Sequence, residues 1–183
     1  MSWPLVRLGD IVFVKGGKRL PKGEEYLGTK TNHPYIRVCD MGIRGLVSSQ
    51  DELRYISEET HQKIKRYTIS CNDVYISIAG TIGVVGSIPK ELDGANLTEN
   101  AAKLVIKNPS ELYRDYLVWF LATSGKASID NQVKATSQPK LALFRIEELE
   151  IPLPPLPEQK RIAAILDKAD AIRRKRQQAI QLA

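Results

Sequence analysis

The chain has 183 residues, of which 43% are hydrophobic and 26% charged, and its formal net charge is +6 at pH 7. Seven basic and three acidic residues lie from Glu158 onward, so four of the six surplus charges belong to this tail and two to residues 1–157. Any surface of the body that binds a polyanion must therefore be local and cannot rest on a basic charge spread over the whole domain.

Neither the cysteines nor the histidines are spaced as metal ligands. Cys39 and Cys71 lack the paired spacing of a metal or redox motif, and His33 and His61 have no partner at ligand spacing. We therefore expect two reduced thiols and no metal. Since no long uncharged apolar run occurs, we expect neither a secretory signal nor a membrane span, and we expect a cytoplasmic protein.

The first candidate for ligand contact is a basic, glycine-bearing segment. Residues 5–14 are rich in apolar side chains and lead to Gly16-Gly17, where a turn is expected. Glycine lets the backbone approach a ligand closely. A short strand is then expected over residues 35–38, followed by a second turn that carries Arg44. The basic side chains of the first segment, with no acid among them, are Lys15, Lys18, Arg19 and Lys22.

A second glycine-bearing turn follows a clear strand pattern. Residues 73–78 alternate as in a half-buried strand, which delivers the turn 79–83, reading AGTIG, at its end. The glycine spacing suggests a phosphate loop, but GxxxxGK[ST] is absent and residues 84–88 resemble another strand, not a helix. We therefore favour a β turn, with Thr81 exposed on it.

A helix and a polar stretch come next. Ser110 can cap a helix that Gly125 ends, with the apolar face Tyr113, Tyr116, Leu117, Phe120 and Leu121 in the core. The polar stretch 124–140 contains a single acid and suits a loop that enters a DNA groove, because Gln pairs with adenine, Lys contacts guanine or phosphate, and Thr touches the thymine methyl group. A solvated surface loop is the alternative. The side chains concerned are Lys126, Gln132, Lys134, Thr136, Gln138 and Lys140.

The end of the body completes the predicted fold. Pro139 is expected to start a helical turn anchored by Leu141 and Phe144, and residues 149–153 alternate as a final strand. Short strands and helices follow no βαβ rhythm, so we predict an α+β fold with a twisted, largely antiparallel or mixed sheet over residues 1–150.

The tail begins with a proline-rich connector, residues 151–157, and continues as a predicted helix over residues 158–183. Prolines favour an extended, semi-rigid strut, which we expect to hold the helix away from the body. An amphipathic helix can instead lie against its own domain. The apolar spacing alternates between three and four, as in a coiled-coil seam, and favours an antiparallel partner helix. The predicted interface is Ile162, Ile165, Leu166, Ala169, Ile172, Arg176 and Ala179.

Residues 152–171, reading PLPPLPEQKRIAAILDKADA, closely resemble the conserved region that follows each target-recognition domain in specificity subunits of type I restriction-modification enzymes. The resemblance implies a target-recognition domain followed by a spacer helix that packs antiparallel on a second helix. The chain would be one half of such a subunit, pairing with a second copy or a second half. The resemblance also implies that methyltransferase (M) and restriction (R) subunits dock on it. S-adenosylmethionine, ATP and Mg would bind to those partners, and no cofactor would bind to this chain.

No catalytic set is evident. Residues 108–110, reading NPS, do not match the NPPY-type motif of adenine methyltransferases, and no nuclease cluster or catalytic triad has support. The leading hypothesis is a non-catalytic DNA-specificity module; the alternatives are a coiled-coil module whose body contacts protein, and a small enzyme with an unrecognised site. The candidate DNA-contact residues are Lys15, Lys18, Arg19, Lys22, Arg44, Thr81, Lys126, Gln132, Lys134, Thr136 and Gln138.

Overall fold

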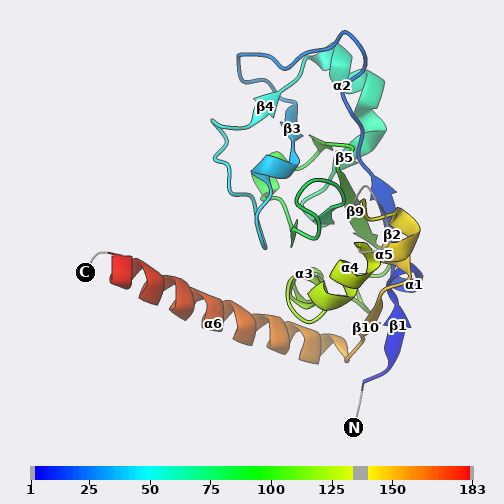
Figure 1. The fold of residues 1–183 in the computed structure, drawn as a ribbon, viewed down its shortest axis with the longest axis vertical. Helices are drawn as coiled ribbons and strands as arrows, with labels where there is room; N and C mark the ends of the chain where they lie inside the picture. The colour runs from blue at the N-terminus through cyan, green and yellow to red at the C-terminus, as the bar shows by residue number, and fades with distance from the viewer. Residues whose placement is uncertain (1–2, 134–139, 182–183) are drawn as a thin grey trace.

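The computed structural model describes residues 3–133 and 140–181. It consists of a body and one long helix, α6 (Leu156–Gln181), which leaves the base of the body and extends away from it (Figure 1). Near this base, β1 (Leu5–Arg7) pairs antiparallel with β10 (Glu150–Pro152). The two ends of the body are therefore joined just before α6 begins.

Two four-stranded sheets form the rest of the strand framework. The first has the order β2-β9-β6-β7 and is antiparallel throughout. The second has the order β4-β3-β8-β5 and contains a parallel pair, β3 with β8. This mixture of short antiparallel and parallel strands confirms the predicted α+β class. The strands are β2 (Val12–Gly16), β3 (Pro34–Ile36), β4 (Arg54–Tyr55), β5 (Thr68–Ile69), β6 (Val74–Ser77), β7 (Val85–Gly86), β8 (Ala95–Leu97) and β9 (Ala101–Ile106).

Short helices connect and cover the sheets. Within the described residues, every helix is too short or too polar to cross a membrane. The α-helices of the body are α1 (Leu8–Ile11), α2 (Glu58–Ile64), α3 (Arg114–Ala122), α4 (Lys126–Val133) and α5 (Leu143–Glu147), and 3-10 turns occupy Val38–Asp40, Lys65–Tyr67 and Lys90–Leu92.

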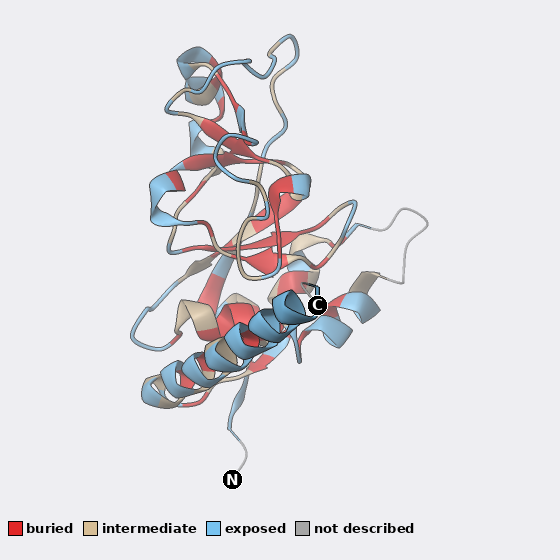
Figure 2. Cartoon of the chain, turned by 90° about the vertical axis from the view of Figure 1, so that its left-hand side faces the viewer, coloured by how far each residue is buried: buried red, intermediate tan, exposed pale blue. Residues whose placement is uncertain are grey.

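The central strand β6 separates two hydrophobic cores. Val74 and Ile76 belong to the core beneath α3, α4 and α5, whereas Tyr75 belongs to the core shared with the β4-β3-β8-β5 sheet. All four residues of β6 are buried. The predicted strand is thus present, but it is covered on both faces and is not half-buried as its alternation suggested. Figure 2 shows this buried interior and the exposed surface of α6.

Three local predictions are wrong. Residues 126–133 of the polar stretch form helix α4 and not a loop, because Ile129 is fully buried and anchors them to the core. The residue before α3 is Tyr113, whereas the backbone N–H of Ser110 donates to Asn108 Oδ1 (3.0 Å) in a separate turn. Phe144 is 57% exposed and anchors nothing in the core, although Leu141 is fully buried as predicted.

The first half of α6 lies against its own body. Gln159, Ala163 and Asp170 are buried, and Ile162 packs against the core beneath α3. The connector therefore does not hold the whole helix away from the body, as the prolines had suggested. Residues 171–181, beyond this contact, are exposed.

Candidate nucleic-acid interface

Strand register brings the two glycine-bearing segments to one edge of the β2-β9-β6-β7 sheet. Gly16, at the end of β2, lies opposite Ala102, and Ser77, at the end of β6, lies opposite Ala101. The start of β9 thus lies between the ends of β2 and β6. The basic segment that follows β2 and the turn that follows β6 must therefore leave the sheet side by side. We call this region the basic edge. It consists of residues 15–22, residues 79–83, Lys126 and Lys140, which forms a short strand bridge there.

Backbone contacts fix the start of the basic segment. The N–H of Gly17 donates to the Ala101 carbonyl (2.9 Å), and the N–H of Lys18 donates to the Leu97 carbonyl (2.8 Å). A Cβ on Gly17 would lie 2.1 Å from the carbonyl oxygen of Thr98, so only glycine fits this approach. The carbonyl of Lys18 accepts the Tyr35 hydroxyl at 2.7 Å. The segment is therefore held on the sheet while the side chains of Lys15, Lys18 and Lys22 are exposed.

Arg19 has an acidic neighbour at this edge. Its guanidinium donates to Glu99 Oε1 at 2.7 Å while its side chain remains 79% exposed. Burial alone would raise the pKa of Glu99, but the hydrogen bond from Arg19 holds that pKa below its usual value. Glu99 is thus ionised at neutral pH and offsets the charge of Arg19. An exposed ion pair of this kind is weak, so Arg19 can readily exchange Glu99 for another anion.

The second turn is shaped by glycines and lies beside α4. Gly80 and Gly83 have positive φ angles of 74° and 81°, and the Ser77 hydroxyl donates to the Thr81 carbonyl at 2.5 Å. A Cβ on Gly83 would lie 3.9 Å from the Lys126 ammonium nitrogen, which places the lysine next to the turn. Both Thr81 and Lys126 are exposed. Ala79 also forms a bridge with Lys140, so another lysine backbone reaches this edge.

The remaining predicted contact residues do not all join the basic edge. The carbonyl of Gln132 accepts a hydrogen bond from Arg145 (2.7 Å), and Gln132 is partly buried. Lys134, Thr136 and Gln138 lie outside the described residues. Among the described residues, no group of three or more His, Cys, Asp and Glu side chains is placed to hold a metal ion.

Arg44 lies against α6. Its guanidinium donates to Asp167 and, at 2.6 Å, to Asp170, and it stacks 4.2 Å from the ring centre of Trp119. The Trp119 indole N–H also donates to Asp167, at 3.0 Å. Because the carboxylates of α6 engage this guanidinium, Arg44 is not part of the basic edge.

Gln159 is a structural residue that the sequence analysis did not single out. It is fully buried, and its Oε1 accepts the backbone N–H of Tyr113 at 2.8 Å. Its Nε2 donates to the carbonyls of Glu111 (2.7 Å) and Pro154 (2.8 Å). The side chain thus joins the connector, the start of α3 and α6. It lies within the PLPPLPEQ motif, which is the only sequence signal that points to it.

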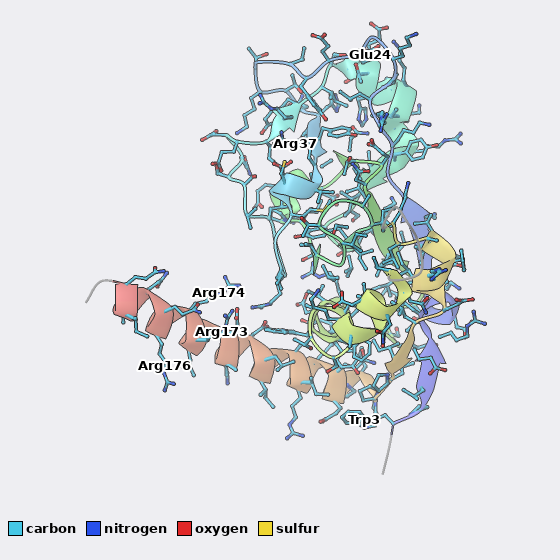
Figure 3. The ribbon with its side chains drawn as sticks, in the orientation of Figure 1. Trp3, Glu24, Arg37, Arg173, Arg174 and Arg176 are labelled. Carbon is cyan, nitrogen blue, oxygen red and sulfur yellow. The ribbon has the colours of Figure 1, made fainter. Side chains whose placement is uncertain are left out.

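The predicted seam of α6 is divided between the body and solvent. Ile162 packs on the body and Leu166 is partly buried. Ile165 and Ile172 are 52% and 55% exposed, and Ala169, Arg176 and Ala179 are exposed as well. Arg173 and Arg174 lie on the side of α6 that faces the body, whereas Arg176 points away (Figure 3). A seam of exposed isoleucines is therefore available for a partner.

Comparison with known proteins gives the family. Residues 2–182 match the model of the type I restriction modification DNA specificity domain. The chain belongs to this family. It is 28% identical over 170 residues to the type I restriction enzyme MjaVIII specificity subunit of Methanocaldococcus jannaschii, an alignment that covers 92% of this chain and 36% of that subunit. It is also 25% identical over 141 residues to the EcoBI specificity subunit of Escherichia coli, covering 75% of this chain and 29% of the relative.

The fold of this specificity domain is also found in solved structures. The HsdS subunit from Thermoanaerobacter tengcongensis superimposes with a TM-score of 0.71 at 22% identity, covering 97% of this chain and 40% of that one. The specificity domain described here thus spans well under half the length of the relatives it matches.

Proposed function

We propose that this specificity domain recognises one half of a bipartite duplex DNA target as a non-catalytic part of a type I restriction-modification system. The observation that carries the proposal is the basic edge, where the register of β2, β9 and β6 brings two glycine-shaped segments together. Exposed Lys15, Lys18, Lys22, Thr81 and Lys126 lie on it. Lysines at such an edge suit phosphate contact, while a threonine on an exposed turn can reach base edges.

The partners follow from the family and from α6. We propose that M and R subunits dock on the chain and that S-adenosylmethionine, ATP and Mg bind to those subunits, with adenine-N6 methylation and cleavage carried out there. The exposed face of α6 supports antiparallel pairing with a second copy or a second half, which would set the distance between two DNA readers. A cytoplasmic location fits this role.

A salt titration of duplex binding tests the DNA contact. After selection of a target from a randomised duplex library, the logarithm of the binding constant should fall linearly with the logarithm of the salt concentration. Lys18→Ala and Lys126→Ala should each weaken binding and reduce that slope by about 1 for each phosphate that is no longer neutralised. Lys168→Ala is the matched control, because Lys168 is an exposed lysine of α6 that lies outside the basic edge. Affinity that did not change with salt, or that fell equally in all three variants, would contradict the proposal.

A further inference from the structure

Side-chain hydrogen bonds attach helix α6 to the body at two separate places, with Ile162 and Ala163 packed on the body between them. Near its start, the buried side chain of Gln159 bonds to the connector and to the start of α3. Further along, Asp167 and Asp170 accept hydrogen bonds from Arg44. Gln159 and Asp167 are eight positions apart, which corresponds to about 12 Å along a helix axis. A helix attached at one place can pivot about it, whereas two attachments this far apart fix the direction of the helix axis.

The second attachment comes from a tight hairpin, residues 40–47, in which Met41 and Leu46 form an antiparallel bridge. The N–H of Gly42 donates to the Gly45 carbonyl and the N–H of Arg44 donates to the Val85 carbonyl, both at 2.8 Å. The buried hydroxyl of Tyr75 donates to the Gly42 carbonyl at 2.7 Å. Arg44 is therefore presented to α6 from the edge of the central sheet and not from a loosely held loop.

The base of the same hairpin is held by a buried carboxylate. Asp40 accepts two hydrogen bonds from the Arg37 guanidinium, at 2.7 and 3.0 Å, and one from the Ser48 hydroxyl at 2.9 Å. Its backbone carbonyl accepts the N–H of Val47 at 2.9 Å, closing the hairpin from the other strand. The hairpin is thus fixed at both its base and its tip.

The backbone of Arg44 is unusual. Its φ of 74° makes it the one non-glycine residue with a positive φ among the described residues. Glycine would adopt this conformation freely, whereas an L side chain is strained there. A conformation of this kind persists where the surrounding structure holds it, and here the side chain is held by two carboxylates and by stacking on Trp119.

We propose that Arg44 is a positioning residue that sets the direction of α6 relative to the body. From Gln159 to Gln181 the helix extends about 33 Å, so a change of about 10° in direction moves its far end by about 6 Å. If the proposed DNA function holds, that displacement corresponds to roughly two base pairs of spacing between two readers, at about 3.4 Å per base pair. The hairpin would then help to set the number of base pairs between the two DNA half-sites that the assembled protein recognises.

Loss of Arg44 should weaken the second attachment without unfolding the helix. Asp170 also accepts from Arg173 and pairs with Arg174, each at 2.7 Å, so its charge stays compensated within α6. The Trp119 indole remains bonded to Asp167. We therefore expect a broader range of helix directions and not complete detachment.

Distance measurement between two spin labels tests this directly in the full chain without DNA. Cys39→Ser and Cys71→Ser remove the native thiols, and Arg66→Cys on the body and Gln178→Cys on α6 supply the label sites. Labelled protein is diluted with unlabelled protein so that only distances within one chain are measured. The parent should give one narrow distance distribution, and Arg44→Gly should broaden it and shift its mean by several ångströms.

Glycine is the informative replacement, because it removes the guanidinium without adding backbone strain. The double variant Asp167→Asn with Asp170→Asn tests the same attachment from the helix side and should broaden the distribution as well. Arg161→Ala is the matched control, since Arg161 pairs with Glu158 of the same helix; its distribution should match the parent. An unchanged narrow distribution in both attachment variants would overturn the proposal and would leave the DNA-binding proposal unaffected.

Discussion

Replacing Gln159 by alanine should weaken the attachment of α6 to the body at the start of the helix. The side chain is fully buried and makes three hydrogen bonds of 2.7 to 2.8 Å to backbone groups of Tyr113, Glu111 and Pro154. Alanine can replace none of them, and the Tyr113 N–H and two carbonyls would lose their partner in a space shielded from water.

The expected cost follows from those three bonds. Each contributes about 1 kcal/mol net, so Gln159→Ala should lower the free energy of unfolding by about 3 kcal/mol. For a chain of this length, 1 kcal/mol corresponds to about 2–4 °C, which predicts a fall in the melting temperature of roughly 6–12 °C.

Urea unfolding, followed by tryptophan fluorescence, measures this change, since Trp119 is buried where α3 faces α6. Gln177→Ala is the matched control: it is the same substitution on the same helix at an exposed position, and it should stay within about 0.5 kcal/mol of the parent. A loss below about 1 kcal/mol in Gln159→Ala would refute the view that this side chain anchors α6.

Three further predictions concern the basic edge, the hairpin and the exposed seam. Gly17→Ala should displace the basic segment, because its Cβ would lie 2.1 Å from the Thr98 carbonyl oxygen; circular dichroism melting should show a clear loss of stability, and duplex affinity should fall. Burial would raise the pKa of Asp40, but hydrogen bonds from Arg37 and Ser48 hold it below its usual value. The contribution of ionised Asp40 to the free energy of unfolding is therefore complete above about pH 4 and is lost as the pH falls through the lowered pKa. The Asp40→Asn variant should have a lower melting temperature than the parent at pH 7, and its melting temperature should fall less in acid. Because an exposed isoleucine seam is costly in water, the chain should self-associate, and Ile172→Lys should favour the monomer in sedimentation velocity.

Each of these has a contrary outcome. A Gly17→Ala protein with parental stability and DNA affinity would mean that the close approach at this position can relax. If Asp40→Asn left the pH dependence of the melting temperature unchanged, the loss of stability in acid would be due to other carboxylates. A parent chain that remained monomeric at high concentration would remove the self-pairing proposal for α6.

Several elements could be predicted because their signals are local. The alternation of residues 73–78 predicted β6, and the glycines after it predicted the turn that holds Thr81. The uninterrupted helical pattern after Pro157 predicted α6, which begins at Leu156, two residues before the predicted start at residue 158. The helix α4 was missed because its stabilising contact is the single buried Ile129, within a stretch whose composition is otherwise that of a loop.

The roles of Arg44 and Gln159 could not be predicted in the same way. Arg44 and Asp170 are 126 positions apart, and Gln159 and Glu111 are 48 apart, so no periodicity or local spacing links them. By composition, Arg44 belonged with the DNA-contact candidates, and only the path of the hairpin beside α6 revealed its partners. In the same way, the prolines of the connector predicted a stiff strut but gave no direction for the helix that follows.

The sequence by itself determined the class of fold, the long terminal helix and the motif shared with type I specificity subunits, because strand alternation, helix periodicity and proline conformation are properties of neighbouring residues. Only the tertiary structure decided which loops share one edge, which arginine serves α6 and how much of that helix remains exposed. Those outcomes depend on strand register and on hydrogen bonds between residues far apart in the chain, whose energies arise only once the body has packed.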